Sequence, residues 1–158
     1  MADLILQPAR MRDAGSIAAM SRRYVEAGLS PAWTVERVVR SIRHRDSTVL
    51  TATSCRALAG IAIMQYGDTS AHLNLLAVVP AYRRKGIGRR MLQWLESAAR
   101  VAGTFVISLE VRAGNGPATR FYEALGYRQS GLITGYYEGV EDAIRMRRDL
   151  SVSAATLR

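Results

Sequence analysis

The stretch that decides the fold is "LAVVPAYRRKGIGRRML", residues 76–92. An apolar run is followed by a proline, three consecutive cations, the glycines Gly86 and Gly88, and then an apolar spacing typical of a helix. Glycines lack Cβ atoms, so backbone N–H groups can approach an anion closely, and a helix N-terminus adds N–H donors and a positive dipole end. The stretch predicts a strand, a loop suited to a phosphate or pyrophosphate, and a helix.

Two familiar phosphate motifs are excluded here. The loop is not a Walker A sequence, because no Gly-Lys-Ser/Thr ends it, and it is not a dinucleotide fingerprint, because Arg89–Met91 stand where a third glycine is needed. On these residues alone, a simple turn with solvated arginines explains the pattern equally well.

Composition predicts one soluble globular domain over residues 1–150 and a flexible tail over 151–158. No apolar run approaches the ~20 residues that span a bilayer. The start "MADLILQPARMRD" lacks the features of a signal peptide, and the lone Cys55 cannot form an internal disulfide. These observations predict a cytoplasmic protein without membrane partners.

The net charge of +9 comes almost wholly from arginine, since Lys85 is the only lysine. Most of these arginines are interpreted as solvated surface residues, but the cluster from Arg83 to Arg90 is dense enough to serve an anionic ligand. No basic helix with interleaved aromatic residues is present, so nucleic acid is not an expected partner. No Cys/His spacing predicts a metal site.

Hydrophobic periodicity and turn residues predict the elements in order. Strands are expected at residues 4–9, 47–53, 57–67, 71–79 and 104–111, with two more before the tail; helices are expected at 13–28, 34–45, 86–103 and 116–127. The expected N-caps are Asp13, Thr34 and Asn115. The first helix is expected to end at Gly28. The inward face of the second helix is expected to consist of Val35, Val38, Val39 and Ile42.

Hairpins come first and strand–helix–strand units follow, which favours a parallel pair within an otherwise antiparallel sheet. The predicted fold class is therefore α/β (α+β), a mixed sheet with helices on both faces.

Three segments resemble a known superfamily. "LAVVPAYRRKGIGRRML" resembles the central motif of the GNAT N-acetyltransferases, Gln/Arg-x-x-Gly-x-Gly/Ala, which binds the pyrophosphate of acetyl-coenzyme A. "LEVRAGNGPATRFYEALGY" and "YYEGVEDAIRM" are similar to segments of the bacterial ribosomal-protein-alanine N-acetyltransferases. The likeness covers residues 71–148 and implies a mostly antiparallel GNAT sheet.

The resemblance implies an acetyl-CoA-dependent enzyme that transfers acetyl directly from the thioester to a primary amine, with acetyl-CoA as cosubstrate and no metal. The implied acceptor is a protein or peptide N-terminus. The alternatives are a small amine such as an amino acid, polyamine or antibiotic, and, in a different class, a non-catalytic CoA sensor or a nucleic-acid-binding module. The protein is expected to be a monomer or homodimer.

The resemblance also implies residues that bind the donor. Backbone groups of Leu76, Ala77 and Val78 would pair with pantetheine like an added strand. The side chain of Asn115 would bind the pantetheine or phosphate arm. The residues implied around the pyrophosphate are Arg83, Arg84, Lys85, Gly86, Ile87, Gly88 and Arg89.

Glu110 is the only carboxylate in an apolar strand, and by resemblance it is the general base, acting directly or through water; the alternative is an ion pair with Arg112 on the same strand face. Tyr122 matches the position that protonates the departing sulfur; the alternative is a core aromatic. His72 is set aside, because a lone histidine at a strand start is more typical of a surface or capping position.

Three aromatic residues are candidates for the acceptor side: Trp33, which is otherwise interpreted as core, and Tyr136 and Tyr137, whose polar tips suit a peptide. The segment "GYYEGVEDA" is shorter than in the ribosomal enzymes, so the acceptor need not be the same protein terminus.

Overall fold

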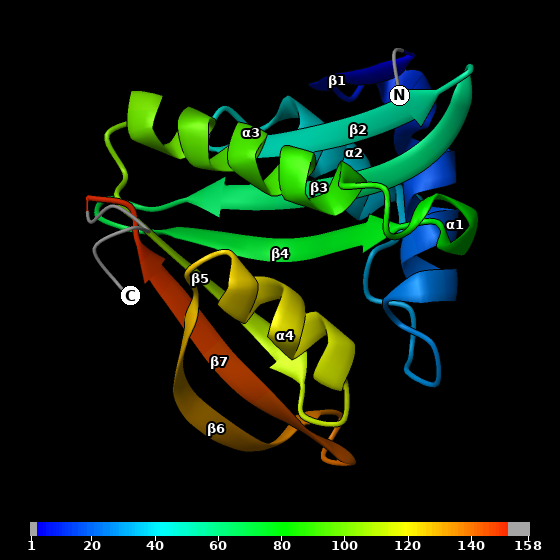
Figure 1. Ribbon diagram of the computed structural model, residues 1–158. Coiled ribbons are helices and arrows are strands. Elements are labelled where there is room, and N and C mark those ends of the chain that lie inside the picture. Colours follow the sequence, from blue (N-terminus) through cyan, green and yellow to red (C-terminus); the bar gives the residue numbers. More distant parts are fainter. Residues whose placement is uncertain (1–2, 152–158) are drawn as a thin grey trace. The chain divides into compact units, whose positions relative to one another are not determined.

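The computed structural model describes residues 3–151, which contain seven strands and four α-helices. In chain order they are β1 (Leu4–Pro8), α1 (Ala14–Tyr24), α2 (Val35–Arg43), β2 (Ser47–Ser54), β3 (Ala57–Tyr66), β4 (Ala71–Val78), α3 (Ile87–Val101), β5 (Val106–Arg112), α4 (Gly116–Ala124), β6 (Arg128–Tyr137) and β7 (Glu141–Asp149) (Figure 1). Short 3-10 turns, Met11–Asp13 and Pro80–Tyr82, precede α1 and α3.

The strands hydrogen-bond in the order β1-β2-β3-β4-β5-β7-β6. The β4–β5 pair is parallel, whereas β1–β2, β2–β3, β5–β7 and β6–β7 are antiparallel. This confirms the predicted mixed, mostly antiparallel sheet and the predicted parallel pair. The chain forms two compact units, one from Met1–Gln65 with Leu73–Ser97 and the other from Tyr66–His72 with Ala98–Arg158.

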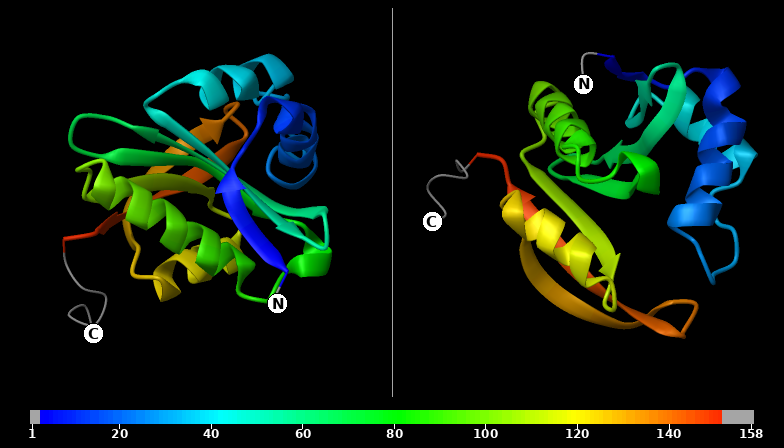
Figure 2. Two further views of the ribbon diagram at one scale, coloured as in Figure 1. Left: turned by 90° about the horizontal axis from the view of Figure 1, so that it is seen from above. Right: turned by 45° about the vertical axis from the view of Figure 1, so that its right-hand side comes forward.

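In the first unit, β3 is buried on both faces. Ile61 and Ile63 belong to a core cluster with Ile17 of α1 and Val38 of α2. On the opposite face, a Cβ added at Gly60 would lie 2.7 Å from the sulfur of Met91 in α3. The helices therefore cover both faces of this part of the sheet, α1 and α2 on one side and α3 on the other, as predicted (Figure 2). A strand enclosed in this way reads as a continuous apolar run rather than an alternating one.

The helix boundaries confirm some of the expected caps and correct others. Thr34 caps α2 by accepting a hydrogen bond from the Arg37 N–H at 3.2 Å. The expectation for Asp13 is wrong: its side chain makes no cap on α1 and instead accepts from the Arg10 N–H at 2.7 Å, because it closes the preceding 3-10 turn. Val35 was expected to face inward but is exposed, since it occupies the first turn of α2. The first helix ends at Tyr24, before Gly28.

A buried carboxylate orders the segment between α1 and α2. Glu26 is 6% exposed, and its Oε1 accepts from the backbone N–H groups of Ala32 at 2.5 Å and Trp33 at 3.1 Å. Its Oε2 accepts from the Ser21 hydroxyl at 3.0 Å. Because a buried carboxylate is costly unless its lone pairs are used, these three bonds explain how Glu26 is accommodated. They also hold Trp33 in the core of the first unit, where it is buried.

Replacing Glu26 by glutamine is expected to lower the free energy of unfolding by about 1–3 kcal/mol, because the two bonds from the backbone N–H groups lose their charge assistance and the Ser21 hydroxyl can no longer donate to the second atom, which becomes an amide nitrogen. Urea denaturation followed by tryptophan fluorescence measures the change. Glu123→Gln, at an exposed position of α4, removes the same charge and should change stability by less than about 0.5 kcal/mol. Equal effects in the two variants would contradict the role given to Glu26.

The second unit contains β5, β7 and β6, with Ala71 and His72 of β4 paired to β5. Helix α4 lies along β5 and β7 in both views (Figures 1 and 2). Asn115 caps α4 as predicted, since its side chain accepts from the Ala118 N–H at 3.2 Å, and Pro117 lies in the first turn. The buried rings of Tyr122 and Tyr127 pack edge to face, 5.6 Å apart.

None of the helices within residues 3–151 combines the length and apolar composition that crossing a bilayer requires. Of the predicted C-terminal tail, Ser151 hydrogen-bonds to Asp149, and residues 152–158 lie outside the described residues. The assignment of residues 1–150 to one domain stays a prediction.

Candidate functional site

A glycine-containing loop joins the end of β4 to the start of α3 in the first unit. Arg84 and Gly86 adopt the left-handed region, with φ of 60° and 78°, and residues 83–86 are exposed. Ile87, the first residue of α3, is buried, so the helix N-terminus is anchored while the loop before it faces solvent. The chain therefore turns sharply at Arg84 and Gly86, whereas Gly88 lies within α3.

The geometry of this loop fits an anionic ligand. A Cβ added at Gly86 would meet nothing within 4 Å, so the backbone at this position is open to an approaching group. The first N–H groups of a helix have no partner within the helix, and its dipole favours negative charge there. A pyrophosphate such as that of acetyl-CoA suits this combination. The roles of residues Arg83–Arg89 toward the donor stay predictions.

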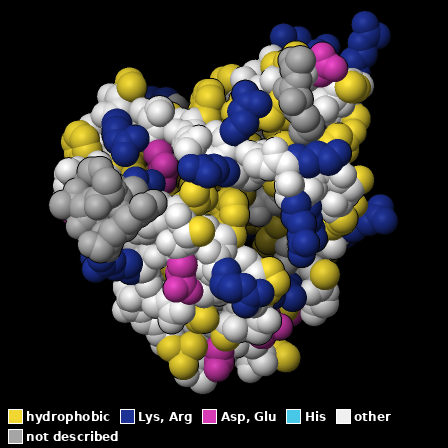
Figure 3. All heavy atoms as spheres, in the orientation of Figure 1, with side chains coloured by type: hydrophobic (Ala, Val, Ile, Leu, Met, Phe, Trp, Pro, Cys, Tyr) yellow, Lys and Arg dark blue, Asp and Glu magenta, His cyan; other side chains and the backbone are white. Residues whose placement is uncertain are grey.

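The cations of the loop differ in what they contact. The Arg83 Nε donates to the Val78 carbonyl at 2.9 Å, so this arginine ties the loop to the last residue of β4. Lys85 Nζ lies 5.7 Å from the centre of the Tyr82 ring. Figure 3 shows Lys and Arg side chains spread over one face of the molecule, with fewer acidic side chains among them. Most of the Lys and Arg residues within 3–151 are exposed, so most of this positive charge lies on the surface, in agreement with the interpretation from composition.

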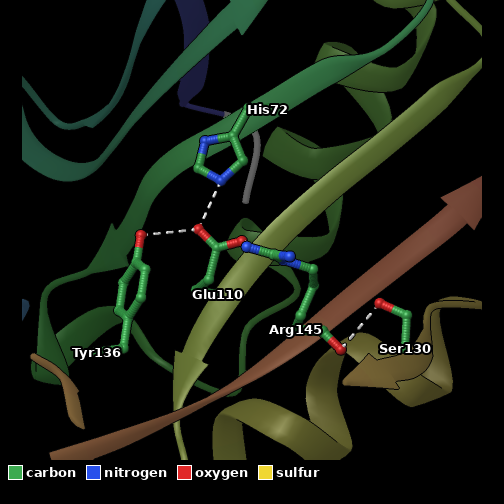
Figure 4. Close-up of polar contacts among 5 residues, drawn as sticks. All are labelled: His72, Glu110, Ser130, Tyr136 and Arg145. Atoms are coloured by element: carbon green, nitrogen blue, oxygen red, sulfur yellow. Dashed lines mark hydrogen bonds and ion pairs between the residues drawn. The ribbon is translucent and has the colours of Figure 1, made fainter. Parts of the chain in front are cut away.

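A cluster of polar side chains lies around Glu110 in the second unit (Figure 4). Buried and partly buried residues alternate along β5, and Ser108 and Glu110 share the partly buried face. The parallel register places His72 beside Ser108, and the antiparallel register places Arg145 opposite Glu110. Three strands therefore bring these side chains together, although they are far apart in the sequence.

The fourth member, Tyr136, comes from an irregular part of β6. The pairing of β6 with β7 shifts between Ile133 and Tyr137, and Gly135 between them has a φ of 65°. The Gly135 N–H donates to Asp142 Oδ1 at 2.8 Å, which holds this bulge. Bulges re-aim the side chains beside them. Here the result is that the Tyr136 hydroxyl reaches Glu110.

The carboxylate of Glu110 is surrounded by donors. Its Oε1 lies 2.7 Å from His72 Nε2 and accepts from the Tyr136 hydroxyl at 3.0 Å. Its Oε2 accepts from Arg145 Nε at 3.3 Å. The hydrogen bond with His72 is the main cause that lowers the pKa of Glu110 to about 2; burial opposes the shift, and the charge of His72 and the bonds from Tyr136 and Arg145 add to it. Glu110 is thus ionised throughout the neutral range.

The alternative ion pair between Glu110 and Arg112 is wrong. Arg112 Nε instead lies 3.4 Å from Glu141 Oε2, and its guanidinium lies over the Tyr137 ring at 5.7 Å. His72 lies at the start of β4 with its side chain 39% exposed, as expected of a surface position, but its Nε2 also contacts the Glu110 carboxylate at 2.7 Å, which the sequence analysis did not predict. The signal that could have found it is the one applied to Glu110, a polar residue within an apolar strand.

Tyr122 lies on α4 and is 8% exposed. Its ring packs edge to face on Phe121, 5.1 Å away, as well as on Tyr127. Burial, together with the nearby Tyr137, raises the pKa of Tyr122 well above its ordinary value. The phenol therefore keeps its proton at any physiological pH, as a proton donor must. Its role in the reaction stays a prediction.

The predicted site residues divide between the two units. Glu110, Tyr122, Asn115, Tyr136 and Tyr137 lie in the second unit; Leu76, Ala77, Val78, the loop Arg83–Arg89 and Trp33 lie in the first. Tyr136 is 45% exposed, whereas Trp33 is 7% exposed and carries the Arg37 guanidinium 3.8 Å above its ring. Trp33 is thus a core residue, which is the alternative that the sequence analysis gave for it. The assignments of Trp33, Tyr136 and Tyr137 to the acceptor stay predictions.

The chain is similar to a known enzyme family and to individual enzymes within it. Residues 22–127 match the model of the acetyltransferase (GNAT) family. The chain is 31% identical over 137 residues to the [ribosomal protein bS18]-alanine N-acetyltransferase of Salmonella typhimurium, an alignment that covers 78% of this chain and 93% of that protein. It is 38% identical over 98 residues to the Escherichia coli protein of that name, covering 60% of this chain and 66% of the relative.

The fold of the chain is also similar to that of a solved enzyme structure. The crystal structure of the ribosomal-protein-S18-alanine N-acetyltransferase from Escherichia coli superposes with a TM-score of 0.81 at 27% identity, over 95% of this chain and 96% of that one. The family model spans the loop, β5 and α4, the elements that carry most of the predicted site. The chain belongs to the GNAT acetyltransferase family.

Proposed function

We propose that this protein is an acetyl-CoA-dependent N-acetyltransferase that transfers acetyl directly to the N-terminal amine of a protein or peptide. The observation that carries the proposal is the alignment with the alanine N-acetyltransferase of Salmonella typhimurium over 93% of that protein's length. A match of this extent includes the elements that follow the loop as well as the loop itself. No enzyme nucleophile is needed, because the acceptor amine attacks the donor directly.

The loop between β4 and α3 would hold the donor. The open backbone at Gly86 and the N-terminus of α3 would bind the pyrophosphate, with Arg84, Lys85 and Arg89 adding charge. Arg83 would position the end of β4, since its Nε is bonded to the Val78 carbonyl. When bound, acetyl-CoA supplies the thioester carbonyl that the acceptor amine attacks. Leu76–Val78 and Asn115 are assigned to its pantetheine arm.

Two proton movements are then required. An α-ammonium titrates near ~8 and must lose a proton before its nitrogen has a lone pair. A free thiol titrates near ~8.5, so the sulfur that leaves as thiolate is stabilised when a neighbouring group donates a proton to it. We assign the first to the Glu110 cluster and the second to Tyr122, whose raised pKa keeps it protonated. Tyr136, half-exposed beside Glu110, is assigned to the acceptor side with Tyr137.

A cytoplasmic location is part of the same proposal, since a chain with a single cysteine has no internal disulfide to maintain. The alternative acceptor is a small amine. It is the weaker candidate because the relative aligned over 93% of its length is named for a ribosomal protein alanine.

Calorimetric titration with acetyl-CoA, followed by an acceptor panel that reports free thiol, tests the function. We expect donor binding and thiol release with peptides that begin with a free α-amine, and none with the same peptides N-terminally blocked. Turnover of an amino acid, a polyamine or an amine-bearing antibiotic far above that of any peptide would move the assignment to small amines. Absence of donor binding would contradict the proposal altogether.

A further inference from the structure

Arginine side chains gather on one face of the sheet in the second unit, next to Glu110. Along β7, Arg145 and Arg147 are two residues apart and share a face, whereas Met146 between them points to the opposite face and is buried. The strand register pairs Arg145 with Glu110, and it pairs Arg147 with Arg128 of β6. Residues paired in this way lie on the same face of a sheet. The three arginines therefore form one continuous group, the arginine face.

The arginine face is accessible to a ligand. Arg128 and Arg147 are exposed, and the Arg145 side chain keeps 51% of its surface exposed although its Nε bonds to Glu110. Among the described residues, 3–151, the ion pairs join other groups, and neither Arg128 nor Arg147 forms one. Like charges directly opposite each other on neighbouring strands are destabilising. An anion that bound between these two arginines would relieve their repulsion.

The sheet beside Arg145 is free of bulky side chains. Gly131 of β6 pairs with Arg145, and a Cβ added at Gly131 would meet nothing within 4 Å. The register shift before Gly131 leaves Ser130 as an extra residue, and its hydroxyl donates to the Arg145 carbonyl at 3.3 Å (Figure 4). The bulge is thus held in place, and the surface over Gly131 has room for the backbone of a bound peptide.

The spacing of the arginines matches that of an extended peptide. Two residues of a strand span roughly 7 Å, so Arg147 lies one such step beyond Arg145 along β7, and Arg128 lies about 5 Å to its side. An extended acceptor has the same rise per residue. If its amine lies at Glu110, as the proposed function has it, its third and fourth residues come within reach of Arg147 and Arg128.

Resting on the proposed function, we propose that the arginine face recognises acidic side chains at the third and fourth positions of the acceptor. The enzyme then selects protein N-termini that carry carboxylates close behind the amine. The guanidinium group suits this task because its planar fork of N–H donors matches the two oxygens of a carboxylate. The resulting ion pairs would lower KM for such acceptors without changing the chemical step.

The charges at the two ends of the arginine face favour a peptide over a nucleic acid. Glu110 lies at one end, and Asp149, two residues beyond Arg147, lies at the other. Hydrogen bonds from Ser151 are the main cause that lowers the pKa of Asp149, and the charge of Arg147 adds to them. A phosphodiester chain along this face would meet both carboxylates. A peptide instead brings its ammonium to Glu110 and its acidic side chains to the arginines.

The kinetic test uses two peptides that begin with alanine and carry either glutamate or glutamine at both the third and fourth positions. At saturating acetyl-CoA, wild type should show a kcat/KM about 10-fold higher for the glutamate peptide, through KM, and the preference should weaken at high salt. In the double variant Arg128→Gln/Arg147→Gln the two peptides should differ by less than about twofold, with kcat unchanged. Arg145 is left in place because it contacts Glu110.

The matched control is Arg45→Gln/Arg100→Gln, which removes the same two charges from exposed positions outside the arginine face and should keep wild-type selectivity. Arg147→Glu should reverse the preference, toward a peptide with lysine at the third and fourth positions. Equal kcat/KM for the glutamate and glutamine peptides in wild type would overturn the proposal. So would a preference that the double variant retains, or an equal loss on both peptides.

A binding measurement separates this proposal from the proposed function. Fluorescence anisotropy of labelled, N-terminally acetylated peptides needs no turnover, and wild type should bind the glutamate peptide about 10-fold more tightly than the glutamine peptide. Equal affinities, together with binding of labelled oligouridylate that the double variant loses, would overturn the proposal in favour of a nucleic-acid surface. Absence of acetyl transfer to every peptide would refute the proposed function instead.

Discussion

Glu110→Gln is expected to lower kcat about 10²–10⁴-fold while the affinity for acetyl-CoA stays within about twofold of wild type. The amide of glutamine is nearly isosteric with the carboxylate but carries no charge. Its NH₂ group can also donate to His72 Nε2, whereas the carboxylate can only accept from it. Steady-state thiol release and calorimetric titration of the donor measure the two quantities.

The control for this variant is Glu123→Gln, which makes the same change at an exposed residue of α4 in the same unit. Its kcat should match that of wild type. If Glu110→Gln kept full turnover at neutral pH, the carboxylate would have no part in removing the proton from the amine. If it lost donor affinity as strongly as turnover, its effect would be structural.

Gly86→Trp is expected to weaken acetyl-CoA binding by at least about 100-fold. The indole would occupy the open space next to the Gly86 backbone, where no atom now lies within 4 Å of an added Cβ, and would keep the pyrophosphate from the N–H groups of the loop. Loss of two charge-assisted hydrogen bonds at about 1.5 kcal/mol each accounts for this factor. Calorimetry with acetyl-CoA measures it directly.

Strain must be separated from blockage, because Gly86 has a φ of 78° and any side chain there is unfavourable. Gly103→Trp provides the matched control. Gly103 follows α3, has a φ of 80°, and likewise has nothing within 4 Å of an added Cβ. We expect Gly103→Trp to lose similar stability in urea denaturation and to keep donor affinity. Equal loss of affinity in both variants, or in neither, would refute the pyrophosphate role of the loop.

Local sequence predicted most of the fold. The order of strands and helices, the caps at Thr34 and Asn115 and the turn at Gly86 follow from periodicity and residue type, which act over a few neighbouring positions. Where a prediction failed locally, as for Asp13, a competing turn used the same side chain. The loop between β4 and α3, its positive charge and the single acid of β5, Glu110, could also be recognised in the sequence, because each is a short contiguous pattern.

The partners of Glu110 were decided only by tertiary structure. Whether it bonds to Arg112 or to Arg145 depends on how β5 pairs with β7, and its contact with His72 depends on the parallel register of β4 and β5. A shift of one residue would turn these side chains to the opposite face. The sequence by itself determined that an acid would lie in this strand. Strand register and the bulge at Gly135 decided that histidine, tyrosine and arginine would surround it, because no local pattern encodes pairing between distant segments.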